Sequence, residues 1–360
     1  MRKPSEVLRQ VFGHDAFRPG QEDIIQAVVA GRETLAIMPT GGGKSLCYQI
    51  PAVCRVGFTL VASPLIALKR EQVQTLQTIG VPAAALCSAN SDEENDRVYE
   101  ALHAKELKIL YMAPERLNKT HTQRLLIQAG VNLIAGDEAH CGSQWGHDFR
   151  PDFLSIGPLR VRLRVPLAAF TATADEETRQ EIRGKLFSGS DAETFLFGFD
   201  RPNIHIAFAA KARPRQQILD FVRANRDTSG IVYCGTRNKT EVLSNALRDE
   251  GFNACHYHGG MIDGERRAVE ERFRHEDALI VVATVAFGMG VDKPDIRWVA
   301  HADLPKSIEA YYQEIGRAGR DGAPAQTLTL FGSDDIRMRR AQIDESLAPM
   351  ERKDIEHGKL

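Results

Sequence analysis

The feature that most constrains the fold is a repeated alternation of short, continuously apolar runs with longer amphipathic stretches. Continuous apolar runs rich in β-branched residues are typical of strands buried on both faces, and strands separated by helices form parallel sheets covered by helices. Two successive sets of such runs predict an α/β fold with two tandem domains. The runs are residues 34–38, 58–62, 108–112, 131–135 and 167–171, then 230–234, 254–258, 279–284, 297–301 and 327–331.

The length of 360 residues also suits two domains better than one. The segment Phe199-Asp-Arg-Pro-Asn203 lies between the two sets of runs. Its Asp-Arg-Pro-Asn sequence predicts a turn, and the proline biases Arg201 towards an extended backbone. We therefore expect a first domain over residues 1–198, a second over 199–332 and a charged, helical tail over 333–360.

Composition restricts the class of protein and of partner. The chain is 43% hydrophobic and 26% charged, as soluble globular proteins are, and its formal net charge is −2. Any surface that binds nucleic acid must therefore be a local basic stripe. Three short basic runs are each either a phosphate contact or a solvated face. They are Arg160, Arg162 and Arg164; Lys211, Arg213 and Arg215; and Arg337, Arg339 and Arg340.

Cysteine spacing and hydropathy exclude further classes. The six cysteines form no C-x-x-C pair, which argues against a disulfide framework and against a four-cysteine zinc site. No apolar run reaches membrane-spanning length, and the residues after Met1 are polar rather than a signal core. These features indicate a reduced, cytosolic enzyme without a membrane partner.

A glycine-rich segment, Met38-Pro-Thr-Gly-Gly-Gly-Lys-Ser45, follows a predicted strand and precedes a predicted helix. Glycines allow backbone N–H groups to surround phosphate oxygens at the positive end of the following helix. In such a loop Lys44 reaches the β- and γ-phosphates and Ser45 binds Mg²⁺. Met38 stands where the usual pattern has its first glycine, and a merely flexible loop is the alternative. The predicted nucleotide contacts are Thr40, Gly41, Gly42, Gly43, Lys44 and Ser45.

Two adjacent acids, Asp137 and Glu138, follow the apolar run at 131–135. Asp137 is suited to hold Mg²⁺, and Glu138 to orient and deprotonate the attacking water. An exposed strand end is the alternative for this pair alone. Together with Lys44 the pair predicts an ATP-hydrolysing site.

The loop and Asp137-Glu138-Ala-His140 resemble superfamily 2 helicases of the DEAH-box type. The following Cys141-Gly-Ser-Gln-Trp-Gly-His-Asp-Phe-Arg-Pro151 is similar to the RecQ family of DNA helicases. The resemblance extends from about residue 8 to residue 332 and implies two RecA-like domains. Its other motifs are Phe17-Arg-Pro-Gly-Gln21, Ser63-Pro-Leu-Ile66, Phe170-Thr-Ala-Thr-Ala174, Val282-Ala-Thr-Val-Ala-Phe-Gly-Met-Gly290 and Gln313-Glu-Ile-Gly-Arg-Ala-Gly-Arg-Asp-Gly322.

For the nucleotide, the resemblance implies that Gln21 selects adenine with its amide donor and acceptor, and that Arg18 adds a contact. Phe17 is either a core residue or a base stacker. Asp292 matches a residue that contacts the ribose or couples to it, with a local cap as the alternative.

The spacing of Gln313, Arg317 and Arg320 places all three on one face if the segment is helical. The resemblance implies that this face closes on the γ-phosphate from the second domain, with Arg320 as the first candidate for the arginine finger and Arg317 as the second. A surface helix with ordinary arginines is the alternative, although Gly316 and Gly319 would weaken such a helix.

For nucleic acid, the resemblance implies an aromatic loop that reports bound single strand to the ATP site. Aromatic rings stack on unpaired bases without reading their sequence. Burial in the core is the alternative, whereas Gly142 and Gly146 favour a mobile loop. Gly136 and Gly142 depart from the family pattern, and we expect them to loosen this loop. The predicted DNA contacts are Trp145, His147, Phe149 and Arg150 in the loop, with Ser63, Arg116, Thr236, Arg237 and Thr284 elsewhere.

Thr171 and Thr173 match the motif that links ATP hydrolysis to unwinding. The hydroxyls of the predicted threonine and serine contacts can equally satisfy local backbone groups. That alternative stays open at this stage.

The resemblance as a whole implies a 3′-to-5′ motor that uses Mg²⁺-ATP on single-stranded or partial-duplex DNA, in recombination and repair. We expect a monomer in the cytoplasm, at the nucleoid of a bacterium or in the nucleus of a eukaryote. Zinc and winged-helix modules often follow in this family, but the cysteine cluster is missing here, so we expect no zinc and weak unwinding. Whether the chain is naturally short or truncated stays open. The alternatives are a DNA-stimulated translocase that barely unwinds, a non-hydrolysing clamp and an RNA helicase.

Overall fold

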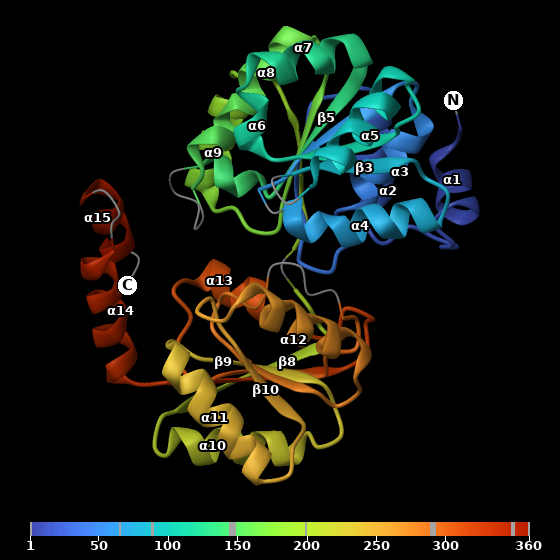
Figure 1. Cartoon of the computed structure of the whole chain (residues 1–360). Helices are drawn as coiled ribbons and strands as arrows, with labels where there is room; N and C mark the ends of the chain where they lie inside the picture. The colour runs from blue at the N-terminus through green and yellow to red at the C-terminus, as the bar shows by residue number, and fades with distance from the viewer. Residues whose placement is uncertain are drawn as a thin grey trace. The chain divides into compact units, whose positions relative to one another are not determined.

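The computed structural model divides into two compact units, Met1–Phe199 and Asp200–Leu360 (Figure 1). It describes residues 2–64, 66–87, 90–143, 149–198, 200–288, 293–346 and 350–358. No helix among the described residues is long and apolar enough to cross a membrane. All six cysteines are buried free thiols.

The first unit is built on a seven-stranded sheet in the order β3-β4-β2-β5-β6-β1-β7, with every neighbouring pair parallel. The five predicted strands are present. The sequence did not predict β3, which is alanine-rich, or β7, which is polar and only half-buried at the sheet edge. The strands are β1 (Thr34–Ile37), β2 (Phe58–Ala62), β3 (Ala83–Leu86), β4 (Ile109–Met112), β5 (Val131–Asp137), β6 (Leu167–Thr171) and β7 (Glu193–Leu196).

Helices cover both faces of this sheet because successive strand residues point to opposite sides. Leu35 and Leu60 face one core, and Ala36 and Val61 face the other. The helices are α1 (Pro4–Gln10), α2 (Gln21–Val29), α3 (Leu46–Cys54), α4 (Ile66–Thr78), α5 (Asp92–His103), α6 (Pro114–Leu117), α7 (Thr120–Ala129), α8 (Ile156–Leu163) and α9 (Glu176–Leu186), with 3₁₀ helices η1 (Ala139–Gly142) and η2 (Pro151–Ser155).

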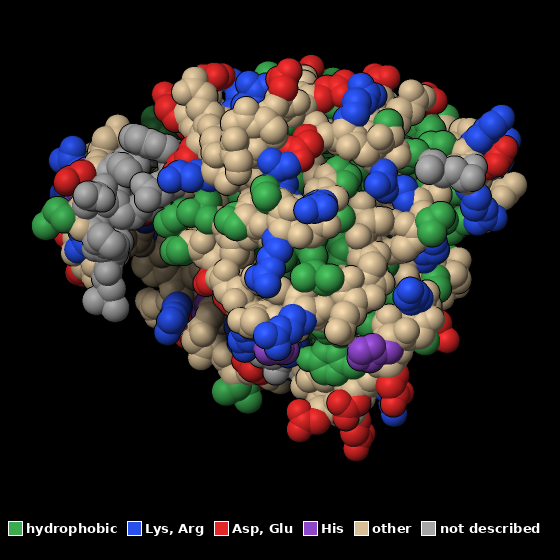
Figure 2. All heavy atoms as spheres, turned by 90° about the horizontal axis from the view of Figure 1, so that it is seen from above, with side chains coloured by type: hydrophobic (Ala, Val, Ile, Leu, Met, Phe, Trp, Pro, Cys, Tyr) green, Lys and Arg blue, Asp and Glu red, His purple; other side chains and the backbone are tan. Residues whose placement is uncertain are grey.

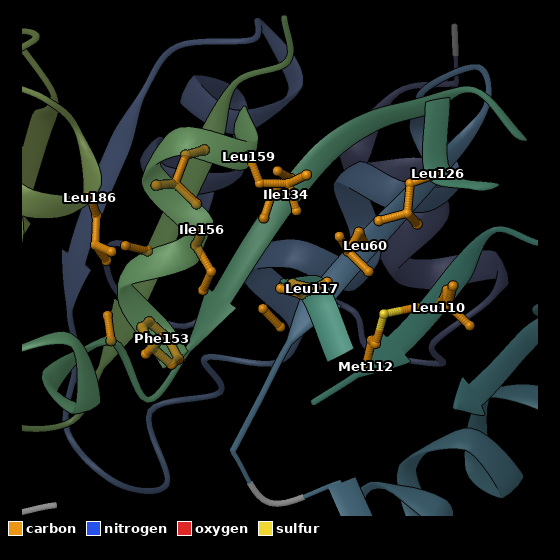
Figure 3. Packing of buried hydrophobic residues seen from close by; sticks show 14 of the residues in the cluster. Leu60, Leu110, Met112, Leu117, Leu126, Ile134, Phe153, Ile156, Leu159 and Leu186 are labelled. Atoms are coloured by element: carbon orange, nitrogen blue, oxygen red, sulfur yellow. The ribbon is translucent and has the colours of Figure 1, made fainter. Parts of the chain in front are cut away.

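One of the two cores packs residues from α5 to α9 against β1, β2, β4, β5 and β6 (Figure 3). Phe153 of η2 lies deep in it, together with Ile156 of α8 and Leu186 of α9. The other core packs α1 to α4 against the opposite face. The two cores exclude water from both faces of the sheet, so the polar side chains of the predicted site lie at the ends of the strands.

The second unit has a six-stranded parallel sheet in the order β10-β11-β9-β12-β13-β8. Strand β8 was not predicted, because it is an edge strand with several exposed residues. The strands are β8 (Ile204–Ala210), β9 (Gly230–Tyr233), β10 (Ala254–Tyr257), β11 (Ile280–Ala283), β12 (Trp298–His301) and β13 (Ala325–Phe331).

Two further cores cover this sheet, one containing α10 and α11 and the other containing α12. Two parallel sheets with helices on both faces are the predicted fold class, which is therefore confirmed. The helices are α10 (Pro214–Ala224), α11 (Arg237–Asp249), α12 (Asp263–His275), α13 (Ile308–Ile315), α14 (Ser333–Glu345) and α15 (Met350–Gly358).

A buried ion cluster anchors α14 to the second sheet. Lys211 Nζ lies 2.9 Å from Asp303 Oδ1 and 2.5 Å from Asp335 Oδ1, and these three side chains are at most 7% exposed. Asp303 also accepts from Lys239 Nζ (2.6 Å) and from the Gly235 N–H (2.8 Å). The cluster therefore ties the ends of β8, β9 and β12 to the first turn of α14.

The basic runs in the sequence are partly structural. Arg160 pairs with Glu33 and donates to the Phe187 carbonyl (2.6 Å), so it is not available as a phosphate contact, and Lys211 belongs to the ion cluster. Arg339 pairs with Glu356 of α15 at 2.7 Å. On the face that Figure 2 shows, Lys and Arg side chains lie scattered among apolar and acidic ones. In that view the described residues form no broad surface of Lys and Arg side chains.

Candidate active site

The glycine-rich loop follows β1 directly, and α3 begins at Leu46, so the predicted strand–loop–helix order is confirmed. Gly41 and Gly43 both have φ of +80°, a left-handed conformation that favours glycine. A side chain at Gly42 would place its Cβ 2.9 Å from the Pro39 carbonyl oxygen. The path of the loop therefore requires glycine at all three positions.

Arg18 and Gln21 lie against this loop. The Gln21 side chain is 1% exposed, and its Nε2 donates to the carbonyls of Gly42 (3.3 Å) and Gly43 (3.2 Å). Its Oε1 accepts from the Arg18 N–H at 2.8 Å, and the Arg18 guanidinium donates to the Gly41 carbonyl. Both ends of the amide thus have partners here, and adenine selection by Gln21 stays a prediction.

Ser45, the residue before helix α3, is hydrogen-bonded to a side chain of helix α4. Ser45 Oγ accepts from Gln72 Nε2 at 3.3 Å. Thr40, Lys44 and Ser45 are half-buried. Burial raises the pKa of the nearby Cys47 thiol to about 12, with Lys44 acting in the opposite direction. Cys47 is therefore neutral at physiological pH and is a packing residue rather than a nucleophile.

The acid pair stands at the end of β5, where Asp137 is its last residue. The Asp137 side chain is 4% exposed, and its Oδ1 accepts from the Glu138 N–H at 3.2 Å. Glu138 has φ of +59° and ψ of +49°, a left-handed conformation rare for a residue with a Cβ. Such strain persists only where the surrounding structure imposes it, and strained backbone is frequent at functional sites.

Thr171, at the end of β6, links the loop and the acid pair. Strand β6 lies between β1 and β5, and the Thr171 carbonyl accepts from the Met38 N–H at 3.0 Å. Its Oγ1 lies 2.9 Å from His140 Nδ1, and that nitrogen is 3.5 Å from Glu138 Oε2. Thr171 Oγ1 also donates to the Thr173 carbonyl at 3.0 Å. One hydroxyl therefore connects the acid pair with the segment after β6.

Arg150 joins three segments that the sequence predicts along the DNA path. Its Nη1 donates to the Pro64 carbonyl at 3.2 Å and lies 3.9 Å from Glu115 Oε1, while its N–H donates to the Cys141 carbonyl at 2.9 Å. These partners follow β2, β4 and β5, which are neighbours in the sheet. Arg150 thus holds the exit of the aromatic loop against the segments of Ser63 and Arg116.

The other predicted DNA contacts of this unit differ in exposure. Ser63 is fully buried, and its Oγ has no hydrogen-bond partner among the described residues. Arg116 and Phe149 are half-buried. Trp145 and His147 lie outside the described residues. Direct DNA contact by Ser63 would require its surroundings to move, whereas Arg116 and Phe149 are partly accessible.

Gly136 and Gly142 are explained by packing against Phe153. A Cβ at Gly136 would lie 3.6 Å from the Phe153 ring, and one at Gly142 would lie 3.2 Å from it. The Phe153 side chain is fully buried and fills the space between these two backbones. The two glycines thus make room for an aromatic core residue, and the expected loosening of the loop stays a prediction.

In the second unit, Thr236, Arg237 and Thr284 lie at the carboxyl ends of β9 and β11, which are adjacent strands. Thr236 caps α11 by accepting from the Lys239 N–H at 3.4 Å, and Thr284 Oγ1 accepts from the Ala286 N–H at 3.4 Å. Local capping, the alternative for both hydroxyls, is therefore present. Thr236 and Arg237 are exposed, and Asp292 lies outside the described residues.

The prediction that Gln313, Arg317 and Arg320 share one helix face was wrong. Gln313 lies in α13, but this helix ends at Ile315, and both arginines stand in the turn that follows. After Ile315 the hydrogen bonds shift to a three-residue spacing, with the Arg317 N–H donating to Glu314 (3.3 Å) and the Ala318 N–H to Ile315 (3.0 Å). Gly319, whose φ of +56° is left-handed, then turns the backbone before Arg320. Arg317 is 9% exposed and donates to the Gly288 carbonyl, whereas Arg320 is half-buried.

A buried histidine–glutamate pair lies beside this turn. His301 Nε2 is 2.8 Å from Glu314 Oε2, and His301 Nδ1 is 3.4 Å from Thr329 Oγ1. The ring of His301 stacks on Tyr233 with centroids 5.4 Å apart. Burial raises the pKa of Tyr233 to about 12 despite the nearby Arg317. The pair fixes α13 on the ends of β9, β12 and β13.

Most of the chain matches known helicase families. Residues 18–182 match the DEAD/DEAH box helicase family, and residues 213–322 match the helicase conserved C-terminal domain. An ATP-dependent DNA helicase RecQ of Synechocystis is 42% identical over 335 residues, which cover 90% of this chain and 70% of that protein. The probable ATP-dependent DNA helicase RecS of Bacillus subtilis is 40% identical over 361 residues, covering 99% and 72%.

The chain belongs to the RecQ family. A RecQ helicase of Haemophilus influenzae is 45% identical over 334 residues, which cover 92% of this chain but 54% of that protein. The chain thus spans about half the length of some RecQ relatives and over two thirds of others.

Solved structures show that the RecQ chain shares the fold of helicase cores. The Mycobacterium smegmatis helicase Lhr bound to single-stranded DNA and AMP-PNP has a TM-score of 0.72 at 22% identity and covers 98% of this chain and 51% of that one. Mss116p bound to single-stranded RNA and AMP-PNP has a TM-score of 0.77 at 16% identity and covers 98% and 78%. Because the same fold occurs with either nucleic acid, fold alone does not decide between them.

Several contacts of this RecQ core were not predicted from its sequence. They include Glu115 and the Pro64 carbonyl around Arg150, the His140–Thr171 bond and the His301–Glu314 pair. All of these partners except His301 lie in or next to a recognised motif or a predicted site residue. Proximity to a motif could have drawn attention to these residues. Predicting which of them contact one another also requires the order of the strands in the sheet, which motif spacing does not provide.

Proposed function

We propose that this chain is the motor core of a 3′-to-5′ DNA helicase or translocase of RecQ type, which couples Mg²⁺-ATP hydrolysis to movement on single-stranded DNA. The observation that carries the proposal is the arrangement of the phosphate loop and the acid pair around Thr171. Support comes from relatives that are named ATP-dependent DNA helicases. We further propose a monomer that acts in recombination and repair, in the bacterial cytoplasm and nucleoid or in a eukaryotic nucleus.

A magnesium ion fits the chemistry of the side chains present. Asp137 and Ser45 offer carboxylate and hydroxyl oxygens, the donors that Mg²⁺ prefers alongside water and phosphate. These two residues would hold the ion, which would neutralise charge on the phosphate oxygens. Lys44 binds the β- and γ-phosphates. Glu138 orients a water molecule and accepts its proton as the water oxygen bonds to the γ-phosphorus, while the bond from that phosphorus to the β–γ bridging oxygen breaks and ADP leaves with the electron pair.

The second unit contributes positive charge to the transition state in this mechanism. Arg320, and secondly Arg317, neutralise the charge that develops on the γ-phosphate oxygens, with Gln313 beside them. An arginine that acts only in a closed state couples hydrolysis to motion of the unit that carries it. Single-stranded DNA is held mainly through its phosphates by Arg116 and Arg150 of the first unit and by Thr236 and Arg237 of the second.

Steady-state ATP hydrolysis with matched single-stranded DNA and RNA tests the proposal. We expect DNA to stimulate turnover more strongly than RNA. Equal or greater stimulation by RNA would contradict the DNA assignment and favour an RNA helicase. Glu138→Gln should lose turnover while still binding ATP, whereas a non-hydrolysing clamp would keep its whole activity. Strand displacement on partial-duplex DNA then distinguishes a helicase from a translocase that barely unwinds.

A further inference from the structure

The second unit starts at Asp200, and its first residues form a tight turn. The Ile204 N–H donates to the Arg201 carbonyl at 2.8 Å, which closes a turn with Pro202 in its second position, where proline is favoured. The turn that the sequence predicts here is therefore present. It presents the side chains of Arg201 and Asn203, both half-buried, to a distant part of the chain.

That distant part is the turn that carries Arg317 and Arg320. Arg201 Nη2 donates to the carbonyls of Ala318 (3.1 Å) and Gly319 (2.9 Å). Asn203 Nδ2 donates to the carbonyls of Gly319 (2.9 Å) and Ala323 (3.0 Å). Arg201 Nε also donates to Asn203 Oδ1 at 3.3 Å, so the two side chains act as one unit.

The contacted carbonyls belong to the two residues that separate the arginines and to a residue just beyond Arg320. The backbone there is left-handed at Gly319, whose N–H donates to the Ile296 carbonyl at 2.9 Å. A Cβ at Gly319 would lie 2.5 Å from Asn203 Nδ2 and 2.7 Å from the Ala323 carbonyl oxygen. Asn203 therefore occupies the space that the glycine leaves, and the backbone position is fixed from both sides.

We infer that Arg201 and Asn203 are positioning residues that set the placement of Arg317 and Arg320. The inference rests on the proposed function of those two arginines in ATP hydrolysis. The α-helix ends before this turn, and the side chains that follow the domain junction add donors to its carbonyls, beside the Gly322 N–H that donates to the Gly319 carbonyl at 3.0 Å. The start of the second unit and its arginine-bearing turn thus form one hydrogen-bonded assembly.

The inference is tested by DNA-stimulated ATP turnover in Asn203→Asp and Arg201→Lys. Asn203→Asp keeps the shape but turns an oxygen towards two carbonyl oxygens. Arg201→Lys keeps the charge but loses the fork of donors. Misplacing a transition-state group by about 1 Å can cost about 100-fold. We expect kcat to fall about tenfold to 100-fold, more for Asn203→Asp, with KM for ATP nearly unchanged because the proposed phosphate-loop contacts with ATP lie in the first unit and are untouched.

A double-variant cycle with Arg320→Ala separates positioning from general stability. If Asn203 acts through Arg320, then Asn203→Asp lowers kcat far less in the Arg320→Ala background than in the wild type. Additive losses would overturn the inference. Arg272→Gln is the matched control, because Arg272 holds Glu276 and Asn253 elsewhere in the same unit and should leave kcat unchanged.

Thermal unfolding of each variant accompanies the assay, and Arg201→Lys decides the question if Asn203→Asp does not fold. Wild-type chain without DNA-stimulated hydrolysis would overturn the proposed function and this inference together. Wild-type hydrolysis that neither substitution changes would overturn the inference alone.

Discussion

The two units share an all-parallel sheet with helices on both faces, yet the loops that connect their strands and helices carry different chemistry. The first unit has a glycine-rich loop after β1 and an acid pair after β5. The second has an arginine-bearing turn after α13 and a buried lysine–aspartate cluster after β12. The fold is thus a common scaffold, and the residues that give each unit its proposed role in ATP hydrolysis lie in the loops between its strands and helices.

The two units also differ in the hydrogen bonds that their buried polar side chains make. In the first unit, Ser63 Oγ and Thr173 Oγ1 are buried without hydrogen-bond partners among the described residues. In the second, Asp303 and Asp335 are both buried and each accepts several hydrogen bonds. Buried polar groups without partners cost stability and often mark functional sites. Among the described residues the second unit also has such atoms, at Tyr311 Oη and Arg317 Nε, so the feature that distinguishes it is the ion cluster.

Among substitutions that would distinguish the two units, we expect the largest loss of kcat from Arg320→Ala in the second unit. An arginine that neutralises transition-state charge in phosphoryl transfer contributes about 10³-fold or more to kcat. We expect that loss in DNA-stimulated turnover, with ATP affinity largely retained because the phosphate-loop contacts proposed for ATP lie in the first unit. Steady-state kinetics with a nucleotide-binding titration measures both quantities. A variant that loses ATP affinity but keeps kcat would assign Arg320 to nucleotide binding instead.

The next effect concerns the ion cluster of the second unit. Asp303→Asn removes a charged acceptor of Lys211 and Lys239, and hydrogen bonds to charged groups contribute about 1.5–3 kcal/mol. We expect the free energy of unfolding of the second unit to fall by about that amount. Hydrogen exchange at Gly235, whose N–H donates to Asp303, should rise. The exposed pair of Arg223 and Glu250 is the control, because surface pairs contribute little.

The same cluster predicts a pH dependence with a definite sign. Burial alone would raise the pKa of Asp303, but hydrogen bonds from Lys239, Gly235 and Lys211 outweigh it and hold this pKa below its usual range. Its contribution to stability is therefore present above the ordinary pKa of an aspartate and is lost as pH falls through the lower pKa of the folded state. Acid unfolding of wild type and Asp303→Asn should converge there. Curves that stay parallel would contradict this assignment.

A smaller effect is expected at the centre of the first unit. Thr171→Val removes the hydroxyl that bonds to His140 and to the Thr173 carbonyl while nearly keeping the volume. A lost buried hydrogen bond costs about 1–3 kcal/mol, and the part expressed in the transition state should lower kcat about tenfold. Thr178→Val on α9, away from the acid pair, is a comparison that should leave kcat intact. Equal kcat in both variants would remove Thr171 from the coupling path.

The smallest effect concerns Gly142. An added methyl group would press on the fully buried ring of Phe153, and overpacking costs about 1 kcal/mol or more. Gly142→Ala should therefore destabilise the first unit, and the loss should shrink in a Phe153→Leu background. Denaturant unfolding of the four chains of this cycle measures the coupling. Equal losses in both backgrounds would show that Phe153 does not set the requirement for glycine.

Sequence patterns predicted the buried strands because both faces of each strand are apolar, as in β5 and β9. They did not predict β7 and β8, since edge strands need no continuous apolar run. The glycine-rich loop and the acid pair were recognised because their chemistry is local in sequence. The bonds of Arg201 to Ala318 and Gly319 join residues more than 100 positions apart, so only the folded chain reveals them.

The same limit explains the wrong helix face at Arg317 and Arg320. Their spacing is compatible with a helix, and the cost of Gly319 within a helix is modest. The left-handed backbone at Gly319 depends on the donors of Asn203 and on the acceptor of Ile296, which are tertiary partners. Local spacing therefore could not distinguish a continued helix from the observed turn.

The most direct test of the central claim is steady-state ATP hydrolysis with and without single-stranded DNA, in the wild type and in Trp145→Ala. Trp145 belongs to the predicted aromatic loop, outside the described residues, and Arg150 at the end of that loop donates to the Pro64 carbonyl beside the predicted DNA contact Ser63. We predict strong stimulation by DNA in the wild type and its loss in the variant, with ATP binding intact. High turnover without DNA that the variant leaves unchanged would contradict a DNA-gated motor.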